Sequence, residues 1–132
     1  MKVIYISHPL TAPSEVERLK NAESAERWAA WIAWTFKVAT ITEWAGLARF
    51  WTEEQGRALG LELDKEHVRR SDEVWLLNPN GEGIVSSGML VEALEGINHG
   101  KAVYNLTSIE FGDRVLIQTM VKSGRLEPRW VP

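Results

Sequence analysis

Two kinds of segment alternate along this chain, and the alternation limits the folds open to it. Short apolar runs rich in β-branched residues occupy residues 3–6, 38–41, 73–77 and 102–106, and longer segments with helical spacing separate them. The short runs predict buried strands, and the longer segments predict helices. We therefore expect an α/β protein, a three-layer α/β/α sandwich whose flavodoxin- or Rossmann-like sheet is mainly parallel and has four to five strands.

Local signals place the expected helices. Ser14 with Glu17 three positions later predicts a capping box at the start of a long helix that runs to about Phe36. A second helix is expected over residues 52–70, divided near its two glycines, and a third over residues 88–99, ended by Gly100. Residues 44–51 are expected to be irregular. Residues 111–123 fit a helix or a strand; we favour a helix there, followed by an extended tail.

Composition excludes several classes of function. The 132 residues, 45% hydrophobic and 25% charged, suit one soluble domain spanning 1–132. Cysteine is absent and the three histidines lack metal-ligand spacing, so we expect neither a metal nor a cofactor. A net charge of −3 argues against a nucleic acid polymer as partner. No apolar run suits a membrane span and no signal-peptide pattern opens the chain, so a cytoplasmic location is expected.

A candidate ligand site follows from the predicted sheet. Parallel sheets bind ligands beyond the carboxyl ends of their strands, which here means residues 7–13, 42–50 and 78–88. In the last of these, Ser86, Ser87 and Gly88 open a helix whose unpaired N–H groups suit an anion such as phosphate. Glu92 follows about one turn later, in position for covalent or acid–base chemistry. An N-cap serine and a surface glutamate are the alternative interpretations.

Three sequence blocks resemble one family. They are Tyr5-Ile6-Ser7-His8-Pro9, then Asp64 with Ser71-Asp72, and finally Ser86-x-Gly88-x-x-x-Glu92 with Gly100-Lys101. In order and spacing they resemble the nucleoside 2-deoxyribosyltransferase-like superfamily across residues 1–106. The details are most similar to nucleotide N-hydrolases and to uncharacterised phage and bacterial members.

The resemblance implies three catalytic residues. Glu92 would be the nucleophile that traps an oxocarbenium-like sugar, Asp64 would assist departure of the base, and Tyr5 would hold Glu92 in place. Two alternatives stay open. Asp64 fits a solvated acidic face in Glu62-x-Asp64-x-Glu66, and Tyr5 fits the edge of a core.

The resemblance also implies a substrate. Nucleoside transferases look to carry aspartate where this chain has Ser86, and a carboxylate there would repel a 5′-phosphate. We therefore expect Ser86, Ser87 and Gly88 to bind the phosphate of a nucleotide. Further substrate contacts are expected from Ser7, His8, Pro9 and the aromatic ring of Trp44, which would stack on the base; His8 equally fits a structural role.

The expected function is an N-glycosidase that hydrolyses the N-glycosidic bond of a (deoxy)nucleoside 5′-monophosphate. Base exchange by a deoxyribosyltransferase and a non-catalytic nucleotide-binding or sensing module are the alternatives. Trp28, Trp31 and Trp34 spread over one face of the first helix. That face predicts either packing against another subunit, in a homodimer or higher homo-oligomer, or a large aromatic core.

Overall fold

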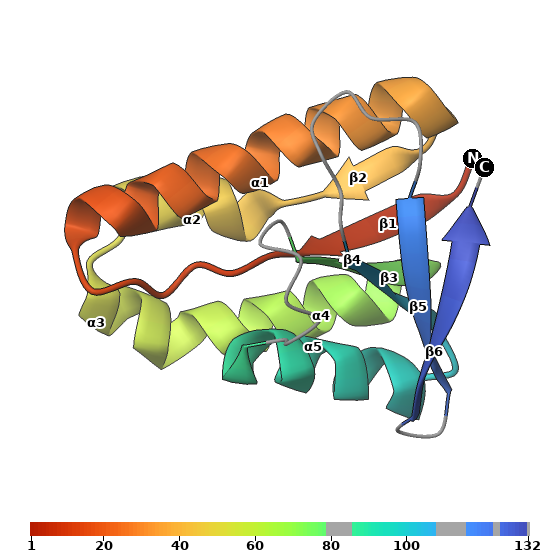
Figure 1. Cartoon of the computed structure of the whole chain (residues 1–132). Coiled ribbons are helices and arrows are strands. Elements are labelled where there is room, and N and C mark those ends of the chain that lie inside the picture. Colours follow the sequence, from red (N-terminus) through yellow and green to blue (C-terminus); the bar gives the residue numbers. More distant parts are fainter. Residues whose placement is uncertain (79–85, 108–115, 123–124, 132) are drawn as a thin grey trace.

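The computed structural model describes residues 1–78, 86–107, 116–122 and 125–131 (Figure 1). The chain forms a sheet between helical layers, which confirms the predicted α/β/α sandwich. Four parallel strands lie in the order β2-β1-β3-β4, with β1 (Val3–Ser7), β2 (Ala39–Ile41), β3 (Glu73–Asn78) and β4 (Ala102–Thr107). Tyr5 sits in the middle of this array, paired with Ile41 on one side and Val74 on the other.

Two further strands extend the sheet beyond β4. They are β5 (Leu116–Lys122) and β6 (Arg125–Val131), and both pairings, β4 with β5 and β5 with β6, are antiparallel. The helix that we expected over residues 111–123 is therefore wrong for Leu116–Lys122, and the extended tail is a strand. Residues 111–115 and 123 lie outside the described residues. Over the described residues the sheet has six strands, four of them parallel, where we expected four to five.

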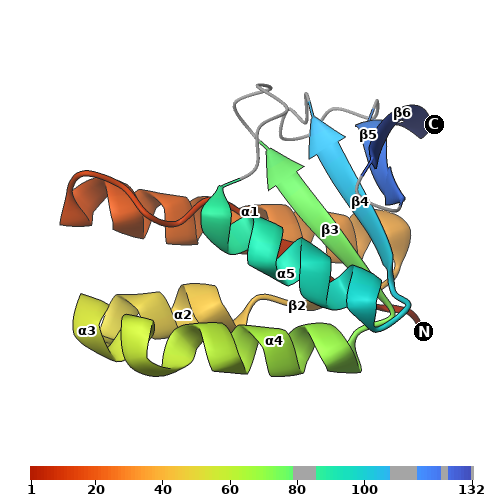
Figure 2. The same ribbon diagram turned by 90° about the horizontal axis from the view of Figure 1, so that it is seen from below.

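The helices occupy two layers (Figure 1). One face of the sheet carries α1 (Glu15–Phe36); the other carries α4 (Leu61–Arg70) and α5 (Ser87–Asn98). Figure 2 shows α5 running alongside β3. Between β2 and α4 lie α2 (Glu43–Phe50), the short α3 (Glu53–Gln55) and a π-helical segment, η1 (Gly56–Gly60). The irregular stretch expected over residues 44–51 is thus wrong, because most of it belongs to α2.

Capping explains where the helices begin and end. The Ser14 hydroxyl accepts a hydrogen bond from the backbone N–H of Glu17, and Thr52 forms a full capping box with Gln55. The predicted division of the 52–70 helix is confirmed by η1, which Gly56 and Gly60 bound. Gly100 follows α5 with φ of 71°, a left-handed conformation that glycine adopts without a Cβ clash.

Two apolar clusters form the core, one on each face of the sheet. Tyr5, Val74 and Val103 pack beneath α4 and α5, while Ile4, Ile6 and Leu77 pack beneath α1. Alternate residues of a strand point to opposite faces, so Tyr5 and Ser7 of β1 both face α5. This alternation places two hydroxyl groups of β1 on the side of the sheet that carries Glu92.

The tryptophan face of α1 is mostly internal. Trp28 packs edge-to-face on Trp31, Trp31 on Phe36, and Phe36 on Trp75 of β3, with centroid separations of 5.4–6.1 Å. This cluster is the aromatic core that was one of our two interpretations. Trp34 is 77% exposed, with the Lys37 ammonium 3.7 Å from its ring centroid. Association of copies through this face stays a prediction.

Among the described residues, no helix combines the length and the apolar character needed to cross a bilayer.

Candidate active site

The candidate site lies where the strand order reverses. The strand β1 has β2 as one neighbour and β3 as the other, and the chain visits β2 before it crosses to β3. The helix α1, which follows β1, and the helix α5, which follows β3, therefore lie on opposite faces of the sheet. At such a switch point the loops diverge and leave a crevice beyond the carboxyl ends of the strands. Tyr5 and Ser7 approach this edge from β1, and α5 carries Glu92 to it.

Glu92 is held by hydroxyl groups. Its side chain is buried at 7% exposure, the Tyr5 hydroxyl donates a hydrogen bond to Oε2, and the Ser7 hydroxyl donates to Oε1 at 3.0 Å. Burial is the largest influence on this carboxyl, and the charge of Asp64 adds to it, so the pKa of Glu92 rises to about 8 although both hydroxyls oppose the shift. Surface location, the alternative for Glu92, is therefore excluded.

Asp64 belongs to the same group of side chains. It comes from α4, lies half-buried, and is within hydrogen-bonding reach of the Tyr5 hydroxyl. Burial raises its pKa to about 6, and the bond to Tyr5 offsets part of the rise. The solvated acidic face that we considered for Asp64 is wrong, because the carboxyl turns inward while Glu62 of the same helix is exposed.

Tyr5 connects the two acids. Burial raises the pKa of its hydroxyl well above the ordinary value, and the charges of Glu92 and Asp64 raise it further, so the hydroxyl keeps its proton. A phenol has one proton to donate and an oxygen that accepts. A hydrogen bond from Tyr5 to one acid therefore requires the other acid to be the donor. The arrangement suits a pair of carboxyls that holds one proton.

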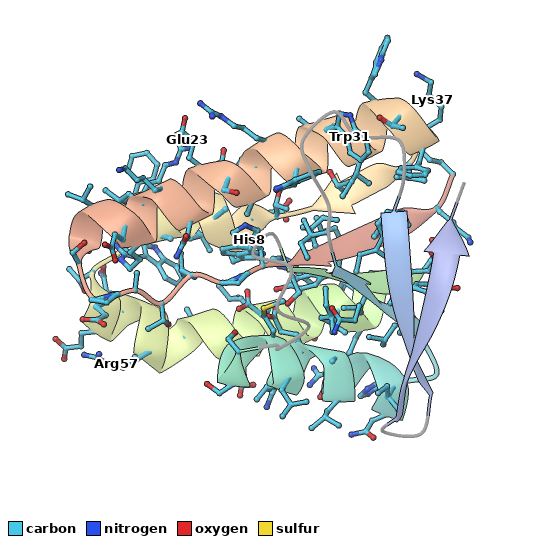
Figure 3. The ribbon with its side chains drawn as sticks, in the orientation of Figure 1. His8, Glu23, Trp31, Lys37 and Arg57 are labelled. Atoms are coloured by element: carbon cyan, nitrogen blue, oxygen red, sulfur yellow. The ribbon has the colours of Figure 1, made fainter. Side chains whose placement is uncertain are left out.

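A cavity of about 460 Å³ opens beside this group. That volume falls within the range of small-molecule sites. Asp64 and Glu92 line it, with residues 86–88 at the start of α5, and the two acids we predicted thus meet in one pocket with Ser86. Trp44, Leu47 and Ala48 form part of its apolar wall. His8 and Arg57 also line the cavity; Figure 3 shows His8 between the two helical layers and Arg57 at the end of the lower layer.

The start of α5 has its capping role and also faces the cavity, while phosphate binding there stays a prediction. The Ser86 hydroxyl accepts from the backbone N–H of Met89 at 3.3 Å, which is the capping role that we weighed as the alternative. Ser86, Ser87 and Gly88 are also exposed and line the cavity, and the Ser86 hydroxyl keeps its own proton for donation.

His8 lines the cavity but uses both ring nitrogens within the protein. Nδ1 donates to the Pro9 carbonyl at 2.6 Å, and Nε2 accepts from the Ser24 hydroxyl at 3.1 Å. Burial lowers the pKa of His8. A neutral ring without a spare donor does not suit phosphate binding, so the geometry favours the structural role we considered for this residue.

Of the other predicted substrate contacts, one lines the cavity and two do not. The Trp44 indole N–H donates to the Ile6 carbonyl at 2.9 Å, and its ring, stacked on His8, lines the cavity. Ser7 is fully buried against Glu92, and Ser7 and Pro9 are not among the described residues that line the cavity. Ser7 therefore acts on Glu92, and the Pro9 carbonyl holds the ring of His8.

Sequence reasoning missed several residues of this cavity. Arg18 of α1 lines its outer end together with Arg57, Glu53 and the two glycines of η1. They are separated by up to 42 positions along the chain and carry no local motif. Asn105 was also missed: it is fully buried on β4, in register with Leu76 and, beyond it, Ser7, and neither amide atom has a hydrogen-bonding partner in the part of the chain described.

In the described ranges, no three acidic or histidine side chains cluster in a way that could hold a metal ion. No family model matches the chain, and comparisons with curated proteins and with solved structures give no match. The site must therefore be interpreted from its own geometry.

Proposed function

We propose that this protein is an N-glycosidase that hydrolyses a (deoxy)nucleoside 5′-monophosphate. The observation that carries the proposal is the convergence of Glu92 and Asp64, from two different helices, on one tyrosine hydroxyl at the wall of a ligand-sized cavity. Breaking an N-glycosidic bond needs one carboxylate to receive the sugar and one acid to protonate the base. A pair that holds a single proton supplies both.

The proposed reaction has two steps. In the first, a Glu92 oxygen bonds to the anomeric carbon, the carbon–nitrogen bond breaks, and the Asp64 proton passes to the departing base. In the second, Asp64 takes a proton from a water molecule whose oxygen attacks the same carbon and releases Glu92. Before the first step the shared proton must lie on Asp64. The Tyr5 hydroxyl allows this, since it can accept a proton from one acid while donating its own to the other.

The start of α5 is the proposed phosphate site. Ser86 lies six residues before Glu92, about 9 Å along the helix axis at 1.5 Å per residue. Ser87 and Gly88, in the first turn, have backbone N–H groups without partners inside the helix, and the helix dipole adds partial positive charge. The sequence adds a second argument. Ser86 is uncharged, whereas a carboxylate at this position would repel a phosphate.

One observation favours the alternative of a non-catalytic nucleotide-binding module. The higher pKa of Glu92, about 8, favours the shared proton on Glu92 at neutral pH, whereas the proposed reaction needs it on Asp64, because a protonated carboxyl is a poor nucleophile. The two functions differ in turnover. Incubation with a panel of nucleoside 5′-monophosphates, with released base measured by chromatography, separates them, because the module would raise the melting temperature with nucleotide and release no base.

Three variants test the assigned roles. We expect Glu92→Gln to lose base release by at least about a thousandfold, as removal of a nucleophile does. Tyr5→Phe should lower kcat while nucleotide still binds, because the route between the acids is cut. Glu62→Gln, an exposed acid on the helix that carries Asp64, is the matched control and should keep wild-type rates. Full activity of Glu92→Gln would exclude Glu92 as the nucleophile.

A further inference from the structure

The two ends of the cavity differ in their polar groups. At the inner end lie Asp64, Glu92 and the start of α5. We call the lining formed by Arg18 of α1 with Trp51, Glu53 and Arg57 the arginine end. The charge of Glu53 acts on Arg18, and Figure 1 shows α3 and the first turns of α1 together at the end of the helical layers farthest from β5 and β6. Figure 3 shows Arg57 at the end of the helical layer farthest from the sheet. When a ligand lies over Glu92 and its phosphate binds at the start of α5, the rest of the ligand extends toward the arginine end.

Arg18 is fixed in position. Its Nε and Nη2 donate to the two carboxylate oxygens of Glu15 at 3.0 and 2.7 Å, and Nη2 also donates to the Ala48 carbonyl at 2.9 Å. The side chain is only 13% exposed. Arg18 lines the cavity, and within the described residues its hydrogen bonds use only Nε and Nη2, so the two N–H groups of Nη1 are available to a ligand. A group held this way loses little freedom when it binds a ligand.

Charge at the arginine end is already balanced. Glu15 neutralises Arg18 through two charge-assisted hydrogen bonds, and Glu53 lies 3.5 Å from Arg57. A phosphate there would meet two carboxylates as well as two guanidinium groups. A neutral acceptor is not repelled by these carboxylates. It still receives a hydrogen bond from a charged donor, and such a bond is stronger than one from a neutral donor.

The walls of the arginine end suit a flat ring. Leu10, Leu47 and Trp51 supply apolar surface, and Gly56 and Gly60 of η1 expose backbone to the cavity. A Cβ placed on either glycine would meet no atom within 4 Å, so the space in front of η1 is open. π-Helical turns occur frequently at functional sites, and this one carries Arg57 and leads directly into α4, the helix that carries Asp64.

We infer that the arginine end receives the nucleobase and that Nη1 of Arg18 selects bases with an exocyclic oxygen over those with an amino group in the same place. The inference rests on the proposed function and adds the class of base to it. An exocyclic oxygen accepts from Nη1, whereas an amino group would bring a second donor to the same point and leave both donors unpaired.

The experiment compares matched pairs of nucleoside 5′-monophosphates. Hypoxanthine and adenine differ at one exocyclic position, oxygen against amino, and so do uracil and cytosine. For the wild type we expect kcat/KM for base release to favour the oxygen-bearing member of at least one pair by about tenfold or more. In Arg18→Met, which keeps an unbranched apolar stem without donors, that ratio should fall to within about twofold of unity.

Two further variants complete this test, one as a control and one as a second probe of Arg18. Arg27→Met removes an arginine of the same helix that forms a similar ion pair, with Glu23, and is 69% exposed; it should keep the wild-type ratio. Glu15→Gln leaves the guanidinium intact but releases one of its anchors, and should lower the ratio part of the way. It replaces Arg18→Met as the test should that variant fail to give a cooperative melting transition.

The outcomes separate this inference from the proposed function. A folded Arg18→Met variant with the wild-type ratio, or a wild type that favours the amino member of both pairs, overturns the role of Arg18 and leaves the glycosidase intact. Failure of the wild type to release base from any nucleotide overturns the glycosidase instead. Kd values for the same pairs then test Arg18: a preference for oxygen that Arg18→Met abolishes supports the role, and equal Kd values within each pair reject it.

Discussion

Glu92 shows how a single side chain can be costly to bury and useful once buried. A carboxyl out of water resists ionisation, yet Tyr5 and Ser7 place two donors on its oxygens. The neighbouring acid Asp64 adds repulsion that only a shared proton relieves. Polar groups are usually buried with partners, and here the partners are residues of β1 that the strand alternation turns toward α5.

The burial of Glu92 predicts a pH-dependent stability. Its folded pKa of about 8 lies above the ordinary value of 4.5, so the unfolded chain binds fewer protons than the folded one between these two pH values. The free energy of unfolding must then fall as pH rises through that window. Each pKa unit corresponds to about 1.4 kcal/mol, so Glu92→Gln should gain several degrees in melting temperature over the wild type between pH 5 and pH 9.

Melting curves of both proteins across that range measure the gain, because the other titrating groups are common to the two. Glu62→Gln, whose side chain is 69% exposed, should follow the wild-type curve in parallel. A difference between Glu92→Gln and the wild type that stays constant with pH would contradict the assigned pKa.

At the scale of elements, the seat of α5 on the sheet sets the position of Glu92. Gly96 lies one turn after Glu92, and a Cβ added there would meet methyl groups of Val74 and Val103, each at 3.0 Å. Neither valine can yield easily, since both are buried in β3 and β4. The small residue thus allows the helix to approach the strands closely enough to present its carboxyl to Tyr5.

Gly96→Ala should therefore destabilise the protein by about 1–3 kcal/mol, as overpacking does, and lower base release by moving α5. Gly46→Ala in α2 is the matched control, because a Cβ there meets nothing within 4 Å. Alanine is preferred to glycine in helices by up to about 1 kcal/mol, so this control should be stabilised. Chemical denaturation measures both variants, and a stability gain in Gly96→Ala would show that α5 sits farther from the sheet.

At the scale of the whole molecule, the sheet brings acids from two helices into one titrating pair. Glu92 and Asp64 are 28 positions apart in sequence, and their pKa values of about 8 and about 6 belong to the pair as a unit. Below both values the pair holds two protons and has no nucleophile; above both it holds none and has no acid.

The proposed chemistry then requires a bell-shaped pH dependence of kcat/KM, with limbs near pH 6 and pH 8 and a maximum between them. Initial rates of base release across pH 5–9 measure it. Asp64→Asn should remove one limb along with most of the activity. A rate that rises steadily with pH through this range would show that no protonated acid takes part.

Much of the fold could be predicted from local signals. Strands β1, β3 and β4 are short apolar runs, and α1 and α5 carry caps that the sequence displays, so each was predicted within a few residues. The helix α2 was missed because it is only eight residues long, and its three buried residues, Trp44, Ala45 and Ala48, are too few for helical spacing to be recognised beside the aromatic residues around them. β5 was missed because its partners, β4 and β6, complete it only after the chain has folded, and a short apolar run alone fits either structure.

Local sequence signals are enough to predict the alternation of strands and helices, and with it the edge of the sheet where a ligand can bind, because buried strands and capped helices follow from residues close together in the chain. Which side chains share that edge depends instead on how the chain folds. The bonds from Tyr5 and Ser7 to Glu92, the inward turn of Asp64 and the position of Arg18 depend on pairing and packing between distant segments. Those contacts set burial, and burial fixes which acid holds a proton and which donor stays free.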